Sequence, residues 1–158
     1  MKNLEIYIHI PFCVRKCEYC DFLSFPADDD AKLRYVKGLM AEMIFYGPLM
    51  KNYQVSSVYI GGGTPSSIDE QWIAALIEGV FDCFNVLPDA EISIECNPGT
   101  LSREKLLAYR DAGINRLSIG LQSANNDELK QLGRIHTFEQ FVTNYEVARN
   151  VGFKNINV

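Results

Sequence analysis

The sequence contains no long hydrophobic run and no cluster of basic residues, and each absence excludes a class of protein. No segment is apolar over the roughly 20 residues that a membrane-spanning helix needs, and the N-terminus lacks the apolar core of a secretion signal. Lys and Arg number 15 against 20 Asp and Glu, a net charge of −5, which argues against a nucleic-acid-binding surface. We therefore expect a cytoplasmic protein with no nucleic-acid partner, and the sequence does not indicate membrane association.

The composition is that of one globular domain. The 158 residues are 47% hydrophobic, which is enough to build a core. The chain has five cysteines, an odd number. In a reducing cytoplasm, such cysteines are expected to be metal ligands or buried thiols rather than a framework of disulfides.

The chain repeats one pattern, in which a short strand of alternating hydrophobicity is followed by a loop and an amphipathic helix. Strands are predicted at residues 4–10, 57–61, 91–96, 116–121 and 154–158. Helices are predicted after the acidic run 28–30, from a capping box at 67–70, over about 102–111, and from a second capping box at 137–140. Strands separated by such helices pair in parallel with right-handed crossovers, so the predicted fold class is α/β.

The two faces of the predicted sheet differ in chemistry. One face is apolar in every strand, and helices must cover it. The other face carries polar or very small residues: Tyr7, His9, Tyr59, Gly61, Ser93, Glu95, Ser118, Gly120 and Gln122. An ordinary (β/α) barrel fills its interior with Val, Ile and Leu. A small, polar inner face therefore predicts a cavity that holds a ligand, and a solvated sheet face is the alternative.

The strand count is too low for a closed barrel. The sequence also stops inside an apparent strand, at residues 155–158. We therefore expect a partial (β/α) barrel with parallel strands and outer helices, truncated in or after the fifth strand. Residues 1–158 would then be the N-terminal part of a core domain from a longer protein.

Three of the five cysteines lie in one short window after the first strand. Cys13, Cys17 and Cys20 have the spacing C-x3-C-x2-C. A structural zinc site needs four protein ligands. The possible fourth ligands are His9, Cys83, Cys96 and His136, and none of them has a convincing spacing. We interpret Cys83 and Cys96 as core thiols.

An iron–sulfur cluster explains the group of three better than zinc or a disulfide does. A disulfide within the window would leave one thiol over. Cubane clusters usually have four Cys ligands, so three ligands would leave one iron open to a non-protein ligand. The missing fourth ligand would then mark the working position of the cluster.

The spacing, at the C-terminal end of a first strand, resembles that of the radical S-adenosylmethionine (radical SAM) superfamily. The resemblance implies a [4Fe–4S] cluster on Cys13, Cys17 and Cys20, with S-adenosylmethionine chelating the open iron through its amino and carboxylate groups. It also implies that an electron from the cluster cleaves the sulfonium to give a 5′-deoxyadenosyl radical, which removes hydrogen from a substrate. The cofactor would supply this chemistry, and the protein would supply orientation and shelter.

The resemblance further implies which residues contact the cofactor. The run GGGTP at 61–65 resembles the element that contacts the methionine part, and its glycines let the backbone approach a ligand closely. Tyr7 and Tyr19 would flank the cluster. The full set of implied contacts is Tyr7, Tyr19, Gly62, Gly63, Thr64, Glu95, Gln122 and Arg134. The alternatives are a barrel ion pair for Glu95 and a surface or helix-capping charge for Arg134.

Six short motifs narrow the resemblance to one branch of the superfamily. YIHIPFC, CDF, GGGTP, ECNPGT, GLQS and LGRIHT resemble oxygen-independent coproporphyrinogen III oxidases of the HemN type and haem chaperones of the HemW type. The oxidase pattern has a further cysteine two residues after the third, where this chain has Phe22. This departure favours the chaperone type.

Two functions therefore remain open. A chaperone would bind haem and pass it to an apoprotein acceptor, whereas an oxidase would use an electron donor and decarboxylate two propionates of coproporphyrinogen III. Haem needs an axial ligand. The only histidines are His9 and His136, and the resemblance places the haem-binding region beyond Val158. A zinc-stapled binding module without a redox role is a third alternative.

Overall fold

The computed structural model describes all 158 residues and contains one parallel sheet. Its strands are hydrogen-bonded in sequence order: β1 (Lys2–Ile10), β2 (Tyr53–Gly62), β3 (Val86–Cys96), β4 (Arg116–Ile119) and β5 (Asn155–Asn157). The helices are α1 (Asp29–Tyr46), α2 (Glu70–Cys83), α3 (Arg103–Asp111), α4 (Asn126–Gln131) and α5 (Phe138–Asn150). None of them combines the length and hydrophobicity needed to cross a bilayer. The structure confirms the α/β class and the five parallel strands.

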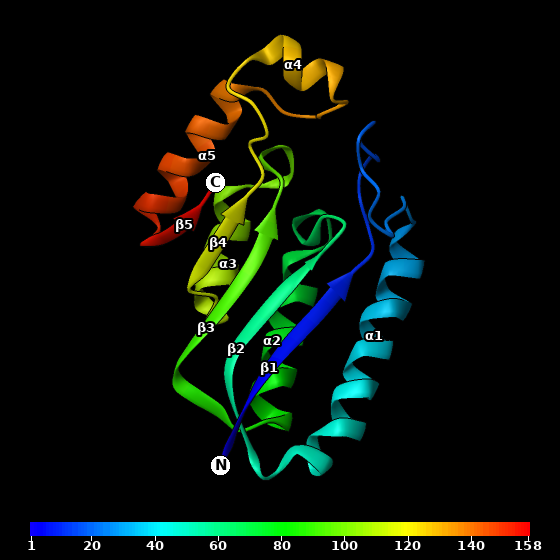
Figure 1. Cartoon of the computed structure of the whole chain (residues 1–158), viewed down its shortest axis with the longest axis vertical. Helices are drawn as coiled ribbons and strands as arrows, with labels where there is room; N and C mark the ends of the chain where they lie inside the picture. The colour runs from blue at the N-terminus through cyan, green and yellow to red at the C-terminus, as the bar shows by residue number, and fades with distance from the viewer.

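The strands all point the same way, so their carboxyl ends form one edge of the sheet (Figure 1). Helices α2 and α3 lie behind the sheet in this view, and the opposite face is not covered by a helix. The loop after β1, in dark blue, and α4 both lie beyond the arrowheads. Functional loops of parallel α/β folds belong at this edge.

The helix start signals of the sequence are mostly correct. The Asp28 side chain accepts the Ala31 N–H at 2.7 Å and caps α1, and Thr137 forms a complete capping box with Gln140 at α5. The predicted capping box at 67–70 is wrong. Asp69 caps α2 instead, because residues 65–67 form a short 3-10 turn in which the Ser67 hydroxyl donates to the Phe12 carbonyl.

The fourth strand is shorter than predicted, and one helix was not predicted. β4 ends at Ile119, after which Gln122 adopts a left-handed backbone with φ 71°. Helix α4 has six residues, of which only Leu129 is buried. One buried position cannot create the hydrophobic periodicity by which amphipathic helices are recognised.

The core lies between the sheet and its helices, as the strand alternation predicts. Eight strand residues that point to this side are 0–3% exposed: Ile8, Ile10, Val58, Ile60, Ile92, Ile94, Leu117 and Ile119. On the other face, the Tyr7 side chain is 59% exposed. The apolar side therefore stabilises the sheet, and the polar side is free to form a site.

Truncating a core side chain of the central strand should destabilise the whole fold. Ile94 is 0% exposed, and Ile94→Ala is expected to lower the free energy of unfolding by about 2–5 kcal/mol. Ile44→Ala, on the outer surface of α1 where Ile44 is 66% exposed, should change it by less than about 0.5 kcal/mol. Urea denaturation followed by circular dichroism measures both, and equal effects would contradict the assignment of the core.

Candidate functional site

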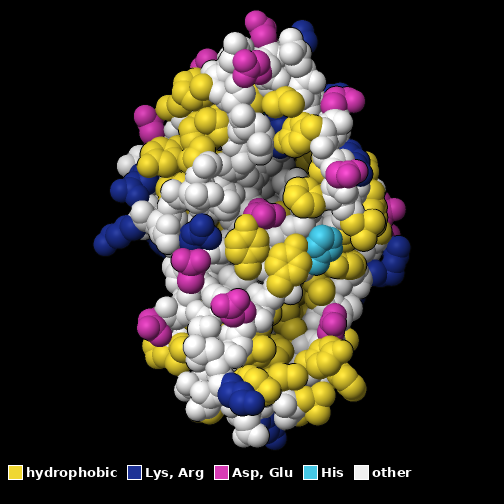
Figure 2. Space-filling view, in the orientation of Figure 1, with side chains coloured by type: hydrophobic (Ala, Val, Ile, Leu, Met, Phe, Trp, Pro, Cys, Tyr) yellow, Lys and Arg dark blue, Asp and Glu magenta, His cyan; other side chains and the backbone are white.

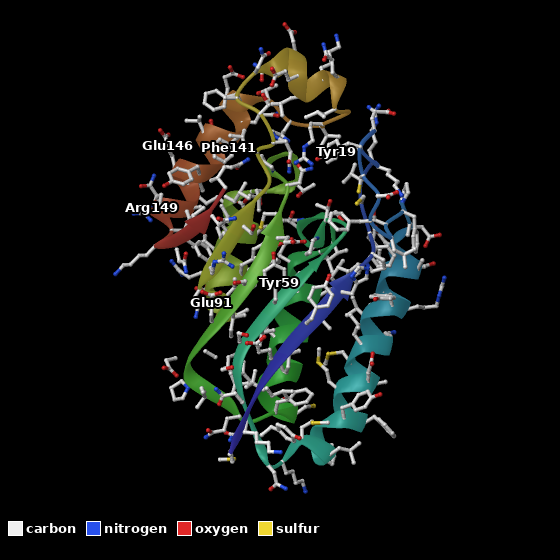
Figure 3. The ribbon with its side chains drawn as sticks, viewed as in Figure 1. Tyr19, Tyr59, Glu91, Phe141, Glu146 and Arg149 are labelled. Atoms are coloured by element: carbon white, nitrogen blue, oxygen red, sulfur yellow. The ribbon has the colours of Figure 1, made fainter.

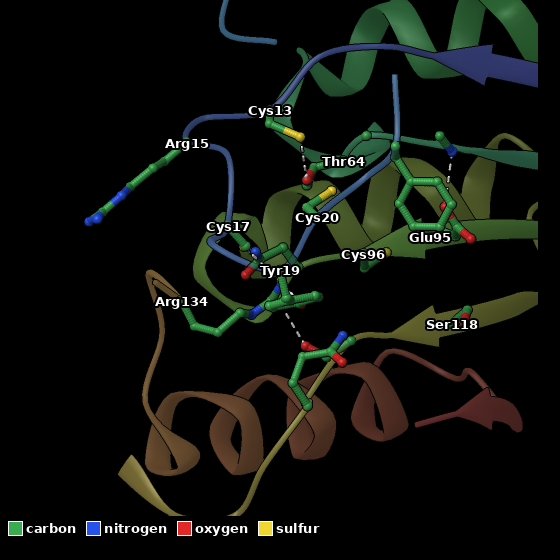
Figure 4. Close-up of a pocket in the computed structure, with 16 residues that line it drawn as sticks. Cys13, Arg15, Cys17, Tyr19, Cys20, Thr64, Glu95, Cys96, Ser118 and Arg134 are labelled. Atoms are coloured by element: carbon green, nitrogen blue, oxygen red, sulfur yellow. Dashed lines mark hydrogen bonds between the residues drawn. The ribbon is translucent and has the colours of Figure 1, made fainter. Parts of the chain in front are cut away.

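A cavity of about 290 Å³ opens at the carboxyl edge of the sheet. Figure 2 shows this hollow on the uncovered face, with hydrophobic side chains around its rim. Ten of the eleven site residues predicted from the sequence line it: Cys13, Cys17, Tyr19, Cys20, Gly62, Gly63, Thr64, Glu95, Gln122 and Arg134. They come from the loop after β1, from the ends of β2 and β3, and from the segments after β4 and α4 (Figure 4).

The three predicted metal ligands lie on the cysteine loop, residues 11–25, which forms no helix and only one isolated strand bridge. The base of the loop is closed by the Phe25 N–H donating to the Pro11 carbonyl and the Cys13 N–H donating to the Phe25 carbonyl. Its far side is held by the Glu18 N–H, which donates to the Leu132 carbonyl at 3.3 Å. Backbone hydrogen bonds within the loop and to Leu132 therefore fix the loop over the cavity.

Each of the three thiols has a polar neighbour. The Thr64 hydroxyl donates to Cys13 Sγ at 3.4 Å, and the Arg134 guanidinium donates to Cys17 Sγ at 3.7 Å. Cys20 Sγ lies 4.0 Å from the Ser24 hydroxyl. Hydrogen bonds to ligand sulfurs orient them and tune a bound cluster.

The arrangement suits a cluster and does not suit an enclosed zinc ion. No three His, Cys, Asp or Glu side chains converge on a point where one metal ion would bind. In a cubane cluster each thiolate binds a different iron, so the three thiols need only face one cavity. Cys96 also lines this cavity, but burial raises the pKa of its thiol far above the ordinary value, and the thiol donates to the Ile94 carbonyl. Cys96 therefore fits the core role that the sequence indicates.

The glycine run after β2 packs against both the cysteine loop and β1. Gly62 has φ +122°, and a Cβ at this position would lie 2.8 Å from the His9 ring. A Cβ on Gly63 would lie 2.9 Å from Cys13 Sγ. Only glycine allows this approach of backbone to backbone and to a ligand thiol.

Glu95 lies near the end of β3, and its side chain lines the cavity. Its Oε1 accepts the Tyr59 hydroxyl at 2.8 Å, and its Oε2 accepts the Gly62 N–H at 3.0 Å. The three ion pairs of the structure involve other residues, so Glu95 forms no ion pair among these 158 residues. Two neutral donors fix this carboxylate, and lone pairs remain on both oxygens.

Arg134 joins the cysteine loop to the segment after β4. One terminal nitrogen donates to the Gly120 carbonyl at 2.7 Å, and the other donates to the Tyr19 hydroxyl at 3.4 Å as well as to Cys17. Its Nε is buried and has no partner, which leaves a donor for a bound ligand. The alternative of a surface or helix-capping charge is therefore wrong. The pKa of Tyr19 is raised, mainly by burial, against the opposing effect of Arg134.

Several residues that the sequence drew attention to lie outside the cavity. Tyr7 stacks on Tyr59 at a centroid distance of 6.2 Å, and its hydroxyl lies 3.0 Å from His9 Nδ1. Figure 3 labels Tyr59 on the open face of the sheet. His9 was expected to face the cavity, but it packs beside Gly62 and does not line the cavity. His136 is 4% exposed, and burial lowers its pKa. Cys83, at the end of α2, is only half-buried.

A polar bracket behind the cavity was not predicted from the sequence. Ser66 is fully buried, and its hydroxyl accepts the Asn97 N–H at 3.0 Å. Lys105 Nζ donates to the carbonyls of Ser66 and Ile68 at 2.7 and 2.9 Å, and burial lowers the pKa of this amine. The bracket joins the loops after β2 and β3. Nothing local in the sequence marks it, because its members lie up to 39 residues apart.

Comparisons with known proteins agree on one family. The chain is 38% identical to the haem chaperone HemW of Escherichia coli (strain K12) over 98% of its own length and 41% of the relative's. It is 37% identical to the oxygen-independent coproporphyrinogen-III oxidase-like protein HemZ of Bacillus subtilis (strain 168), covering 99% of this chain and 32% of the relative. The chain thus spans well under half the length of these relatives.

The fold matches a solved structure of the same group. Coproporphyrinogen III oxidase (HemN) from Escherichia coli superposes with a TM-score of 0.90 at 31% identity, over 98% of this chain and 36% of that one. The expected partial barrel is therefore confirmed. The Radical SAM superfamily profile matches residues 7–158, nearly the whole sequence. The chain belongs to the radical SAM superfamily.

Proposed function

We propose that this chain is the cofactor-binding part of a HemW-type haem chaperone. Cys13, Cys17 and Cys20 would hold a [4Fe–4S] cluster, and S-adenosylmethionine would occupy the adjoining cavity. Family membership implies this cluster and this cofactor. The observation that carries the proposal is that three thiols face one cavity without a fourth side-chain ligand to enclose a metal.

The polar residues of the cavity have distinct tasks in this proposal. When bound, the cluster supplies one-electron reduction to S-adenosylmethionine. Thr64 and Arg134 orient the ligand sulfurs, and Gly62 and Gly63 allow the cofactor to approach the backbone. Glu95 would accept hydrogen bonds from donor groups of the cofactor. Gln122 and the free Nε of Arg134 extend this polar wall, and Tyr19 would flank the site, whereas Tyr7 lies outside the cavity.

Phe22 supports the chaperone over the oxidase. It lines the cavity, and its side chain is 69% exposed. At this position the loop presents an apolar ring instead of the further thiol of the oxidase pattern. An exposed ring suits contact with an apolar macrocycle such as haem.

Coproporphyrinogen III oxidation is the second candidate. The superposition on HemN favours it, since the two structures agree over nearly all of this chain. That function needs an electron donor and converts two propionates to vinyl groups, whereas the chaperone needs an apoprotein acceptor for haem. The zinc-stapled module is not supported, because no side chains enclose a single ion.

Cluster loading should depend on the three cysteines of the loop and on no other cysteine. After anaerobic reconstitution with iron and sulfide, Cys13→Ser, Cys17→Ser and Cys20→Ser are each expected to lose most of the bound iron and of the absorbance near 400 nm. Cys83→Ser is the matched control, since Cys83 lies at the end of α2 and away from the cavity. Loading that survives in all three loop variants would contradict the ligand assignment.

Haem and coproporphyrinogen III separate the two candidate functions. Each is added in turn to the reconstituted protein of full natural length, together with S-adenosylmethionine and a reductant. The chaperone predicts a stable haem complex with its own Soret band and no release of CO2 from coproporphyrinogen III. Release of two CO2 per porphyrinogen would decide for the oxidase.

A further inference from the structure

Both oxygens of the Glu95 carboxylate are hydrogen-bonded inside the protein. Tyr59 donates to Oε1 from β2, and the Gly62 N–H donates to Oε2 from the end of the same strand. Both donors lie on β2, which pairs with β3 beside Glu95. The carboxylate therefore has one orientation, with its unused lone pairs turned to the cavity.

The contact between Tyr59 and Glu95 also needs the space that Gly61 leaves by having no side chain. A Cβ on Gly61 would lie 2.8 Å from the Tyr59 ring, 3.0 Å from Glu95 Oε2 and 3.1 Å from the Tyr7 ring. Gly61 does not have a positive φ, so the backbone does not require glycine there. What requires glycine at position 61 is the meeting of Tyr59 and Glu95 above it.

The Tyr59 hydroxyl is a permanent donor. Burial, and then the hydrogen bond to Glu95, raise the pKa of Tyr59 to about 12. The Tyr7 ring, stacked at 6.2 Å with an interplanar angle of 21°, covers one side of the Tyr59 ring. Tyr59 itself does not line the cavity. Any effect that it has on a ligand there must pass through Glu95.

We propose that Tyr59 is a positioning residue, which holds Glu95 in the orientation that accepts an ammonium or hydroxyl donor of S-adenosylmethionine. This inference rests on the proposed cofactor site. Without the Tyr59 hydroxyl, Glu95 keeps only the Gly62 N–H and can rotate about its side-chain bonds. The cofactor would then have to order Glu95 on binding, which weakens its affinity.

Tyr59→Phe tests the proposal, since it removes the hydroxyl and keeps the stacked ring. Binding of S-adenosylmethionine to the reconstituted protein, measured by anaerobic equilibrium dialysis, is expected to weaken about tenfold. Tyr46→Phe is the matched control, because Tyr46 lies at the end of α1, its ring meets Phe45 edge-on, and it does not line the cavity. The control should bind like the wild type, and both variants should have its thermal midpoint within a few degrees.

The effect must disappear when Glu95 is absent. In a Glu95→Ala background, Tyr59→Phe is expected to change the affinity by less than about twofold, because the two residues act as one unit. An equal loss in both backgrounds would overturn the proposal. Gly61→Ala is a second route if Tyr59→Phe fails to fold, since it displaces Tyr59 from Glu95 while keeping both, and it should cause a similar loss. Wild-type affinity in Gly61→Ala would count against the proposal.

A measurement without cofactor separates this inference from the proposed function. The Gly62 amide donates to Glu95, so loosening of Glu95 should speed its hydrogen exchange about tenfold in Tyr59→Phe. Unchanged exchange at Gly62 overturns the positioning role, whatever the cofactor affinity. If exchange at Gly62 is faster in Tyr59→Phe but the protein binds no S-adenosylmethionine, Tyr59 does position Glu95. The proposed function is then the claim that fails.

Discussion

The hydrogen bonds that hold the cysteine loop over the edge of the sheet are the constraint on which the site depends. The loop has almost no regular structure of its own, and distant segments fix it through Thr64, Leu132 and Arg134. The Thr64 N–H donates to the Phe12 carbonyl at 2.7 Å, so the glycine run and the cysteine loop are joined at the first ligand, Cys13. The site is therefore a product of the whole fold, and a short peptide with the same three cysteines would not have its shape.

The two faces of the sheet have different roles in this arrangement. The helix side buries an apolar layer and supplies the stability, so the open side can carry polar groups that would be costly in a core. Some of those groups bind one another before any ligand arrives, as in the pair of Tyr59 and Glu95. Such pre-organisation lowers the cost of ordering a cofactor site when the cofactor arrives.

The two faces of the sheet and the position of the cysteine site could be predicted from the sequence, because the signals for both are local. Strand alternation predicts the two faces, and the spacing of the cysteines predicts their meeting at one cavity. The contacts between segments far apart in the chain could not be predicted this way. Lys105 looks like an ordinary helical lysine until Ser66 is placed beside it, and Gly61 looks like turn chemistry until Tyr59 and Glu95 meet over it. The misplaced cap of α2 has the same cause, since tertiary contacts draw Ser67 into the preceding turn.

The central claim is that three cysteines leave one iron open to S-adenosylmethionine. It is tested most directly by the electron paramagnetic resonance of the reduced, reconstituted protein with and without S-adenosylmethionine labelled with ¹⁵N in its amino group. The account predicts a changed cluster spectrum and a ¹⁵N hyperfine coupling from direct binding to iron. A spectrum that is unchanged by the cofactor and shows no coupling would contradict it.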